Sequence, residues 1–375
     1  MFTLRARNVN EALYKAILAL DEHGISEDSR NGPVLVMPEP VTTVYLRPQE
    51  RVMTMPERDH NPFFALFETL WMFAGRNDLD YLTKFNKNMA LYSDDGTSVR
   101  GSAYGYRWRQ WFGHDQLLEC CEHLENNPES RRVVMSMWDA ASDPLVESKD
   151  IPCNLQVLFR MRTVGQRHAT NGNVPIYDLD MTVYNRSNDV IYGAYGSNAV
   201  HFSMLQEYVA AYLNNSRKLK GHVLVGKYFQ VANNLHAYTD NLAYQRVQRV
   251  FQQRKTPVCQ YEAAAQRDLY TVRLVQVDEQ ADQFLEECGW FVDHGDDYVY
   301  SNTFISDVAV PMLKAFNVWR DRDSQLNHYA RWKKAMYECE SIEAEDWEKA
   351  ASEWLSRRYA AAAALKQKDE NNVSE

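Results

Sequence analysis

The residues with the clearest chemical potential lie between positions 184 and 205. Arg186, Ser187 and Asp189 follow a β-like run, and Asn198 comes shortly before an amphipathic helix. A guanidinium and a hydroxyl together hold anions such as phosphate, and a carboxamide both donates and accepts hydrogen bonds. This short segment therefore supplies an anion clamp, a carboxylate and an amide that can read a polar ring, which are the groups that a nucleotide site needs.

A candidate nucleophile lies upstream, at Cys153. It follows Pro152 at the entrance of another β-like run, residues 155–159. The thiolate form of cysteine is the nucleophile, and neighbouring arginines lower the pKa of a thiol. Taken alone, a Pro-Cys-Asn sequence at a strand start is more often structural. A functional role for this cysteine therefore depends on the other residues of the site.

Composition limits the classes of protein to which these residues can belong. The chain has 375 residues, of which 45% are hydrophobic and 12% aromatic, enough for one large core or two modest ones. Its formal net charge of −10 argues against polymeric nucleic acid as a partner, since such binding normally requires a basic domain. A single nucleotide is compatible with this charge, because its phosphate needs only a local arginine cluster.

Cysteine spacing and apolar content bear on the compartment. The six cysteines show neither zinc-ligand spacing nor a compact disulfide framework, so we assign no metal and expect a cytoplasmic protein. The first residues form no apolar signal segment. No apolar stretch approaches the roughly 20 residues of a membrane-spanning helix. We therefore predict no membrane partner.

Hydrophobic patterning predicts the elements that must position these residues. Apolar positions at helical spacing predict a helix over residues 8–23, with Gly24 as its stop. Two further helices are expected over 61–75 and 114–125. Strands are expected within 32–52 and over 132–138, 155–161, 178–184 and 223–230.

The character of the sequence changes after about residue 262. Helical and charged patterns dominate from there, ending in a helix over 347–365 and a polar tail, 366–375, that we expect to be frayed. The predicted fold class is α+β, with one mixed or antiparallel β-sheet packed on helices and then a helical C-terminal extension. The predicted domains are a catalytic domain at 1–262 and the extension at 263–375.

The sequence resembles the thymidylate synthase and deoxynucleotide hydroxymethylase family. The resemblance is carried by the order and spacing of Cys153, the segment 186–189 and the later run Leu235–Tyr238. The likeness extends over about residues 30–241. Further matches are Glu68-Thr-Leu-Trp71 with Gly75, the segment Tyr104–Arg109, and Ser130-Arg131-Arg132 ahead of a strand that ends in Trp138. Several motifs in the family's order are far more specific than any one of them.

The resemblance implies covalent catalysis and a phosphate clamp shared between subunits. Cys153 would add to C6 of a pyrimidine ring and turn C5 into a carbon nucleophile. Arg186 would lower the pKa of this thiol and also contact phosphate. The other members of the clamp would be Arg30, Arg131, Arg132 and Ser187. Because the paired arginines of the family reach across from a second subunit, the resemblance implies an obligate homodimer.

The resemblance also implies how the base and the one-carbon donor are held. Asn198 would donate to O4 and accept from N3–H of uracil, whereas aspartate at this place would suit cytosine. Strict counting from Arg186 leaves Ser197 as the alternative reader. The remaining implied roles are His236 and Tyr238 at the ribose hydroxyl, Glu68 ordering water near O4 and moving protons, Tyr104 polarising the water that removes the C5 proton, and Asp189 and Gly193 at the folate. The implied cofactor is 5,10-methylenetetrahydrofolate.

The product depends on whether water reaches the reactive exocyclic methylene group. Synthases of the family shield this carbon with a tryptophan about nineteen residues after the Glu-x-x-Trp motif and with an apolar C-terminus. Here Ala90 occupies that position and the last residues are polar. Asn154 also replaces the family's histidine, and Asn185 replaces a glutamine. These departures favour hydroxymethylation of dUMP, as in bacteriophages with modified bases.

Other functions stay open on the sequence alone. A divergent thymidylate synthase is the nearest alternative, followed by a dCMP hydroxymethylase. A catalytically silent relative would serve as a binding or assembly protein, with the segment after residue 262 as its interaction arm, but it would have no chemical need for Cys153. His114, His123 and His201 form no motif and are expected to be structural or exposed.

Overall fold

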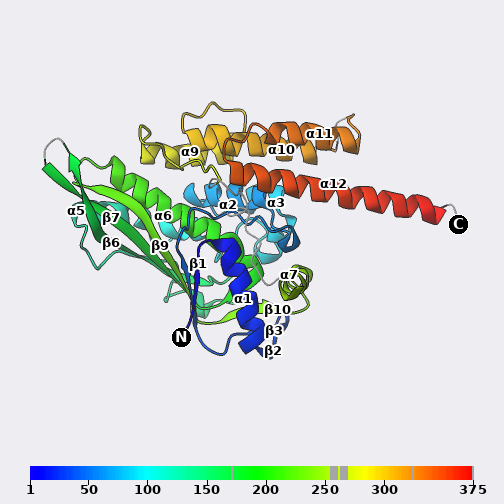
Figure 1. The fold of residues 1–375 in the computed structure, drawn as a ribbon, viewed down its shortest axis with the longest axis horizontal. Coiled ribbons are helices and arrows are strands. Elements are labelled where there is room, and N and C mark those ends of the chain that lie inside the picture. Colours follow the sequence, from blue (N-terminus) through cyan, green and yellow to red (C-terminus); the bar gives the residue numbers. More distant parts are fainter. Residues whose placement is uncertain (170–171, 254–260, 262–268, 323–324, 374–375) are drawn as a thin grey trace.

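Two mixed β-sheets and the helices around them make up the part of the chain that the structure describes (Figure 1). It is a computed structural model that describes residues 1–169, 172–253, 261, 269–322 and 325–373. The larger sheet has six strands in the order β1-β4-β9-β7-β6-β5. Their bounds are β1 (Phe2–Ala6), β4 (Val41–Tyr45), β9 (His222–Ala232), β7 (Gly172–Asn185), β6 (Asn154–Ala169) and β5 (Val134–Ser136).

The six-stranded sheet is built around a long antiparallel hairpin of β6 and β7. β9 runs parallel to β7, and β5 pairs antiparallel with β6 at the edge. Side chains alternate between the two faces of a strand, so Val157, Phe159 and Met161 are buried on one face. On the other face residues are half-buried or exposed, among them Tyr184 and Leu224. The expected strands are confirmed, and both strands of the hairpin are longer than predicted.

The second sheet was not expected as a separate unit. It has the order β2-β3-β10-β8, and its strands are β2 (Ile25–Ser29), β3 (Gly32–Val36), β10 (Leu235–Tyr238) and β8 (Asn188–Asp189). β8 and β10 have only two and four residues, too few for a period-2 pattern to be recognised. Their parallel pairing sets His236 opposite Asp189, so this small sheet joins two distant motifs.

The helices pack on the large sheet and on one another (Figure 1). The α-helices are α1 (Val9–His23), α2 (Pro62–Phe73), α3 (Leu79–Phe85), α4 (Tyr104–Arg109), α5 (Gln116–Asn126), α6 (Asn198–Asn215), α7 (Leu242–Gln253), α9 (Ala281–His294), α10 (Val310–Arg320), α11 (His328–Cys339) and α12 (Glu345–Val373). Shorter helical turns are η1 (Pro56–Arg58), η2 (Lys87–Tyr92), η3 (Asp143–Leu145), η4 (Val190–Ser197) and η5 (Ile305–Ala309).

α2 is the central helix of the core. Asn61 caps it by accepting a hydrogen bond of 3.2 Å from the N–H of Phe64, and Pro62 occupies its first turn, where no N–H partner is needed. Nearly every residue of α2 is buried, including Phe67 and Trp71. Each such side chain contributes about 1.5–3 kcal/mol through burial. The predicted helix at 61–75 is therefore confirmed as a fully buried one.

The helical C-terminal extension is confirmed, and it shares one hydrophobic core with the rest of the chain. Phe63 of α2 contacts both Phe316 of α10 and Trp354 of α12, with ring centroids 5.4 and 5.5 Å apart. The predicted domain boundary at 262/263 lies outside the described residues and stays a prediction. α12 continues to Val373, beyond the helix end expected at Leu365.

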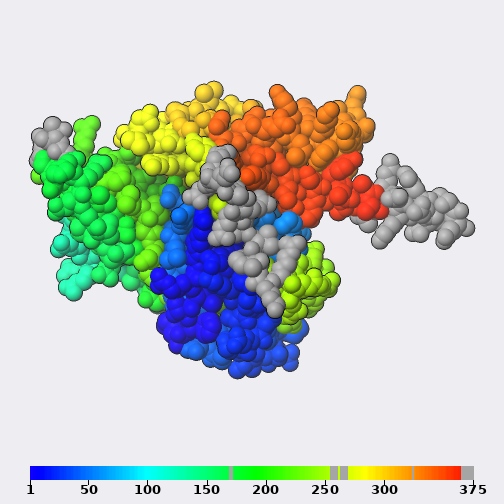
Figure 2. Space-filling model, viewed as in Figure 1, coloured from blue at the N-terminus to red at the C-terminus, as the bar shows by residue number. Residues whose placement is uncertain are grey.

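α12 projects from the body of the molecule in the ribbon view (Figure 1), and in the space-filling view its red described part lies beside α11 (Figure 2). In the described part of the chain, no helix combines the length and the apolar character needed to cross a membrane.

Candidate active site

Cys153 lies just before β6, opposite the end of β7. Its backbone N–H and that of Asn154 both donate to the hydroxyl of Tyr104, at 3.3 and 3.4 Å. Its carbonyl accepts a hydrogen bond of 2.9 Å from the backbone N–H of Arg186. Tyr104 begins α4, and Gly105 packs so closely on α2 that an added Cβ would meet backbone. The sulfur is thus carried by a backbone that is fixed from two sides.

Arg186 holds the loop that precedes the cysteine. Its Nε donates to the carbonyl of Pro152 at 2.8 Å, and its Nη2 donates to the carbonyl of Ile151 at 3.1 Å. Asp150, on the same loop, accepts hydrogen bonds of 2.8 Å from two consecutive backbone N–H groups ahead of α4. Within the described residues the Arg186 guanidinium makes no further hydrogen bond, which leaves Nη1 available to an anion.

The electrostatics of the thiol differ from the sequence-based expectation. Burial raises the pKa of Cys153, and the carboxylate of Asp150 adds to this effect. The positive charges of Arg186 and Arg30 lower the pKa, but burial outweighs them. Arg186 therefore lowers the pKa of this thiol as predicted, but the net shift is upward because burial is the larger effect.

Three buried asparagines form an amide cluster beside Cys153. Asn154 Nδ2 donates to Asn198 Oδ1 at 3.3 Å, and Asn198 Nδ2 donates to Asn154 Oδ1 at 3.4 Å and to Asn188 Oδ1 at 3.2 Å. Gly193 closes one side of the cluster, since a Cβ atom there would lie 2.4 Å from Asn188 Oδ1. The position where the family has histidine thus carries an amide that fixes Asn198.

A turn of π-helix, η4, accounts for the extra residue between Gly193 and Asn198. The backbone N–H of Asn198 bonds to the carbonyl of Gly193, five residues back. A π turn holds one residue more than the i→i−4 turn of an α-helix. The additional step is therefore absorbed within η4, and Asn198, rather than Ser197, is joined to the residue that follows Cys153.

Asp189 lies at the entrance of η4 with one free carboxylate oxygen. Its Oδ1 accepts from the N–H groups of Ile191 and Tyr192 at 2.9 and 2.5 Å. Its Oδ2 is buried and has no hydrogen-bond partner among the described residues. Burial raises the pKa of Asp189, while the Tyr192 N–H and the charges of His236 and Arg58 oppose the rise.

Arg58, a neighbour of Asp189, and His60, a neighbour of Arg58 and His201, were missed in the sequence. Arg58 is buried and donates to the carbonyl of Ile191. Burial lowers the pKa of Arg58 to about 10. Burial, with the charges of Arg58 and His201, lowers the pKa of His60 to about 3, so this ring is neutral at physiological pH. The available signal was an arginine three positions after the mostly apolar run 52–55.

The small sheet carries the predicted sugar-binding pair. His236 Nδ1 lies 2.8 Å from Asn234 Oδ1, and the rings of His236 and Tyr238 meet edge to face at 5.3 Å. The β2–β3 turn lies beside them, since Asn31 Nδ2 donates to the Tyr238 hydroxyl at 3.4 Å. Arg30 is exposed on this turn, and its charge acts on Cys153. The structure therefore brings this pair and Arg30 to one side of the thiol.

Glu68 has an unexpected partner. On α2, it lies with Oε2 3.0 Å from Nε2 of His201 on α6, and both side chains are almost completely buried. The expectation that His201 clusters with no other group is wrong, while its expected structural role is not tested. The motif search missed it because the two residues lie far apart in sequence and meet only where α2 packs on α6.

Two predicted phosphate ligands, Arg131 and Arg132, are not brought to the thiol by contacts within one chain, whereas the third, Ser187, follows Arg186 beside it. Arg131 and Arg132 are exposed side chains just before β5, at the edge of the large sheet. Ser187 is half-buried next to Arg186. No side-chain hydrogen bond or ion pair of these three residues is formed within the described part of the chain.

The segment around Ala90, where the family's synthases have a tryptophan that excludes water, lies at the rim of the site. Ala90 and Leu91 of η2 are exposed, and Tyr92 retains half of its exposure. Burial raises the pKa of Tyr92, and the nearby groups of Tyr192 and Tyr238 add to the rise. The rim therefore carries partly exposed side chains of Tyr92 and Tyr192 rather than a buried apolar cover.

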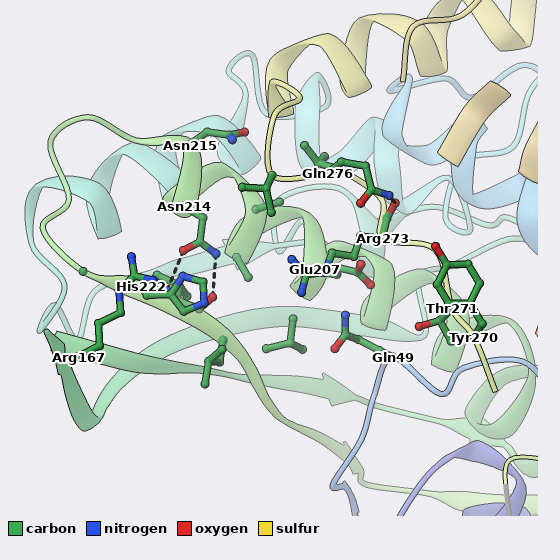
Figure 3. Close-up of a pocket in the computed structure, with 18 of the residues that line it drawn as sticks. Gln49, Arg167, Glu207, Asn214, Asn215, His222, Tyr270, Thr271, Arg273 and Gln276 are labelled. Carbon is green, nitrogen blue, oxygen red and sulfur yellow. Dashed lines mark hydrogen bonds between the residues drawn. The ribbon is translucent and has the colours of Figure 1, made fainter. Parts of the chain in front are cut away.

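A separate cavity of about 810 Å³ lies between α6, β9 and the segment 269–277 (Figure 3). Charged residues on its wall include Arg167, Glu207 and Arg273. No residue of the predicted site lines it. Among the described residues, no group of three or more His, Cys, Asp or Glu side chains is arranged to hold a metal ion.

Comparison with known proteins identifies the family of this chain. The family model for thymidylate synthase matches residues 22–281. The chain belongs to the thymidylate synthase family. The deoxyuridylate hydroxymethyltransferase of Pseudomonas phage M6 is 41% identical over 370 residues, which cover 98% of this chain and 97% of that relative.

Other members of the family match over shorter regions. The deoxyuridylate hydroxymethyltransferase of Bacillus phage SP01 is 35% identical over 213 residues, 54% of this chain and 50% of the relative. The thymidylate synthase of Streptococcus suis is 33% identical over 179 residues, 46% of this chain and 56% of the relative. Of these three relatives, only the hydroxymethyltransferase of phage M6 matches along nearly the whole chain.

Proposed function

We propose that this chain is a folate-dependent enzyme that hydroxymethylates C5 of dUMP. Cys153 bonds to C6 of the uracil ring, which makes C5 nucleophilic, and Asn198 binds the base through O4 and N3–H. The reciprocal amide pair of Asn154 and Asn198 supports this reading, because it joins the Asn198 carboxamide to the residue that follows the thiol. Since Nδ2 of Asn198 donates to both Asn154 and Asn188, O4 replaces one of these two acceptors when the base binds. The near full-length likeness to a deoxyuridylate hydroxymethyltransferase supports the same substrate.

The phosphate is bound by arginines on two sides of the sulfur. Arg186 and Arg30 both act on Cys153 electrostatically, so a phosphate dianion bound between them lies close to the thiol. Ser187, His236 and Tyr238 complete the nucleotide site. A bound phosphate offsets part of this positive charge and so reduces its effect on the thiol. Addition of the thiol therefore depends on how the bound uracil ring is oriented toward the sulfur.

The residues around Asp189 fit a folate. The buried and unpartnered Oδ2 of Asp189 calls for a hydrogen-bond donor, and the N–H groups of a reduced pterin ring are such donors. Arg58 donates to the carbonyl of Ile191 within η4, the turn that also contains Gly193. When bound, 5,10-methylenetetrahydrofolate supplies a one-carbon unit at the formaldehyde oxidation level. Tyr104 orients the water that takes the C5 proton.

Access of water to the one-carbon unit decides the product, and the single observation that carries the hydroxymethyl assignment is the open rim. Ala90 is exposed where synthases have a shielding tryptophan, and α12 leads the C-terminus away from the site (Figure 1). Hydride transfer requires a site closed to water. With the rim open, water attacks the exocyclic methylene carbon and gives the hydroxymethyl product.

The same enzyme functions as a homodimer that joins the exposed faces of two large sheets. This face carries the exposed residues Tyr184 and Leu224, and Arg131 and Arg132 project at the sheet edge without a partner in the described chain. A twofold axis places the same patch of both subunits in one interface. Each subunit then contributes its arginine pair to the phosphate in its neighbour's site.

Mass spectrometry of the product from dUMP and methylenetetrahydrofolate tests the proposal. A gain of CH2O is expected, whereas a gain of CH2 with formation of dihydrofolate identifies a divergent thymidylate synthase. Parallel reactions with dCMP test the base, and a strong preference for dCMP contradicts the role of Asn198.

Cys153→Ala is expected to abolish tritium release from C5-labelled dUMP. Unchanged release in this variant contradicts covalent catalysis and favours a silent relative.

A further inference from the structure

His201 and Glu68 form a buried acid–base pair that the assigned roles do not explain. His201 lies in the first turn of α6 and Glu68 in the middle of α2, with His201 Nε2 3.0 Å from Glu68 Oε2. The two side chains are 2% and 7% exposed. The distance is that of an ion pair, but the angles are not those of a hydrogen bond. Both ring nitrogens and Glu68 Oε2 thus lack a hydrogen-bond partner among the described residues.

Such unsatisfied buried groups are rare in folded proteins and indicate a missing ligand, a missing water or a catalytic role. In enzymes without substrate, catalytic hydrogen bonds are often poorly aligned and tighten only when the substrate binds. His201 and Glu68 are likewise close in distance but poorly aligned for a hydrogen bond. A purely structural pair buried in the core would be expected to satisfy its donors and acceptors.

The pair lies beside the base end of the site. His201 is three residues after Asn198, so both lie on the same face of α6. Asn198 is bonded to Asn154, the residue that follows Cys153. The next residue on α6, Phe202, has its ring 6.1 Å from that of Tyr104. The histidine therefore shares a helical turn with the side chain that reads the base.

Of the basic side chains near Glu68, only His201 is placed to act as the partner of its carboxylate among the described residues. His60 also lies near His201, but burial, Arg58 and His201 itself hold the pKa of His60 down to about 3, so it carries no charge. Arg58 is directed to the carbonyl of Ile191 and to Asp189. Among the described residues, His201 is the group at ion-pair distance from the Glu68 carboxylate.

We propose that His201 is the positioning residue that aims the Glu68 carboxylate at the water captured by the exocyclic methylene carbon. This inference rests on the proposed hydroxymethylation. In that step the water oxygen bonds to the methylene carbon, the exocyclic double-bond pair moves to give the enolate at O4, and the released proton goes to Glu68. Collapse of the enolate then breaks the C6–S bond and returns the electron pair to Cys153.

His201 performs this role by holding Oε2. When substrate binding aligns the pair, Nε2–H donates to that oxygen, which leaves the other carboxylate oxygen to face water. Without the ring, Glu68 would be a buried carboxylate with no partner, and it would turn or take up a proton. Either change removes the base from the water without changing the bonds that hold the uracil ring or the thiol.

Replacement of His201 in the full-length protein tests the proposal through the fate of the methylene intermediate. His201→Leu removes the donor, and His201→Gln keeps an N–H at similar reach. Each variant is assayed for tritium release from C5-labelled dUMP, for hydroxymethyl product, and for the thioether formed when 2-mercaptoethanol is added. The thiolate of this additive bonds to the methylene carbon without giving up a proton, so its attack needs no base from the protein.

His201→Leu is expected to lower hydroxymethyl formation about tenfold to hundredfold, while tritium release persists and the thioether accumulates. The KM for dUMP should stay within about twofold, and His201→Gln should recover most of the product. Glu68→Gln should show the same split, and the double variant should be no worse than either single one. Ser203→Ala, equally buried two residues along α6, is the matched control and should behave as the wild type.

Two results overturn the inference while the proposed function stands. One is an equal loss of tritium release, hydroxymethyl product and thioether in a His201→Leu protein with a wild-type melting temperature. The other is a His201→Gln variant no better than His201→Leu. If His201→Leu does not fold, His201→Asn, whose amide is one methylene shorter than that of glutamine, takes its place. A wild-type product that gains only CH2 overturns the proposed function itself and this inference with it.

Discussion

Cys153 sits in an environment that opposes its own ionisation. Burial is the largest influence on the pKa of its thiol and raises it, Asp150 raises it further, and Arg186 and Arg30 lower it. Since the thiolate is the reactive form, only a fraction of the protein carries an active nucleophile at neutral pH. The two arginines therefore set how large that fraction is, in addition to their role at the phosphate.

Arg30→Gln isolates this electrostatic effect, because Arg30 is exposed and its removal leaves no cavity. Loss of a positive charge destabilises the thiolate, so the pKa of Cys153 rises further and less thiolate is present at any pH below it. We expect iodoacetamide to label Cys153 about two- to threefold more slowly at pH 7. Labelling is followed by mass spectrometry of the Cys153 peptide across pH. Arg217→Gln, at the far end of α6, is the control; equal rates in both variants would contradict the assignment.

At the scale of elements, the π turn η4 determines which residue reaches the thiol. It accommodates one extra residue between Gly193 and Asn198, the residue at which α6 begins. The close packing of Gly193 on Asn188 is part of this arrangement, because no side chain fits there. The amide cluster therefore depends on the backbone of η4 as much as on its own side chains.

Gly193→Ala is expected to disturb the amide cluster. Its Cβ would lie 2.4 Å from Asn188 Oδ1 and 3.4 Å from Asn198 Nδ2, so at least one asparagine must move. Loss of a buried hydrogen bond costs about 1–3 kcal/mol, and kcat/KM for dUMP should fall at least about tenfold. Gly289→Ala on α9, where a Cβ has no neighbour within 4 Å, should keep full activity and a similar or higher melting temperature. Equal kinetics in the two variants would contradict the importance of η4.

The sequence predicted the long elements of this fold, but not the contacts that bring its distant motifs together, and the chemistry of the site stays a prediction. Amphipathic spacing was enough for α1, and alternation was enough for the β6–β7 hairpin. β8 and β10 were too short to be recognised, although they align Asp189 with His236. The count between Gly193 and Asn198 stayed ambiguous because a π turn has no sequence signature. His201 was misjudged since its partner, Glu68, is reached only through helix packing.

At the scale of the whole molecule, α12 is tied to the segment 58–60, which carries Arg58 beside the proposed folate site. Asp59 lies between Arg58 and His60 and adopts a left-handed backbone with φ of 55°. Arg357 and Arg358 of α12 both bind its carboxylate, the latter at 2.8 Å. The C-terminal extension therefore restrains the loop that carries Arg58.

Releasing this restraint should weaken folate binding more than nucleotide binding. In the double variant Arg357→Ala, Arg358→Ala we expect the KM for methylenetetrahydrofolate to rise about threefold to tenfold, with the KM for dUMP within about twofold. The loss of stability should be small, about 1 kcal/mol or less for each of these partly exposed pairs. Asp59→Asn, which keeps the left-handed preference but loses the charge, should reproduce the effect. Equal changes in both KM values would indicate a general loss of structure instead.

The shared phosphate clamp makes the dimer testable through mixed subunits. If Arg131 and Arg132 act in the neighbouring site, a Cys153→Ala chain still supplies good arginines, and an Arg131→Ala, Arg132→Ala chain still supplies a good nucleophile. Each variant alone should be nearly inactive. After joint unfolding and refolding, half of the dimers are mixed and each holds one intact site, so activity should return to about one quarter of the wild-type value.

Mixing Cys153→Ala with Tyr104→Phe provides the control, because both defects then lie within the part of the site that one chain builds, and no intact site can form. Light scattering of the wild type should give the mass of two chains. Recovery in the first mixture but not in the second requires arginines that cross the interface. Dimers that form in both mixtures without recovery in either would mean that Arg131 and Arg132 serve their own chain, in which case the loop before β5 must move toward Cys153 when the nucleotide binds.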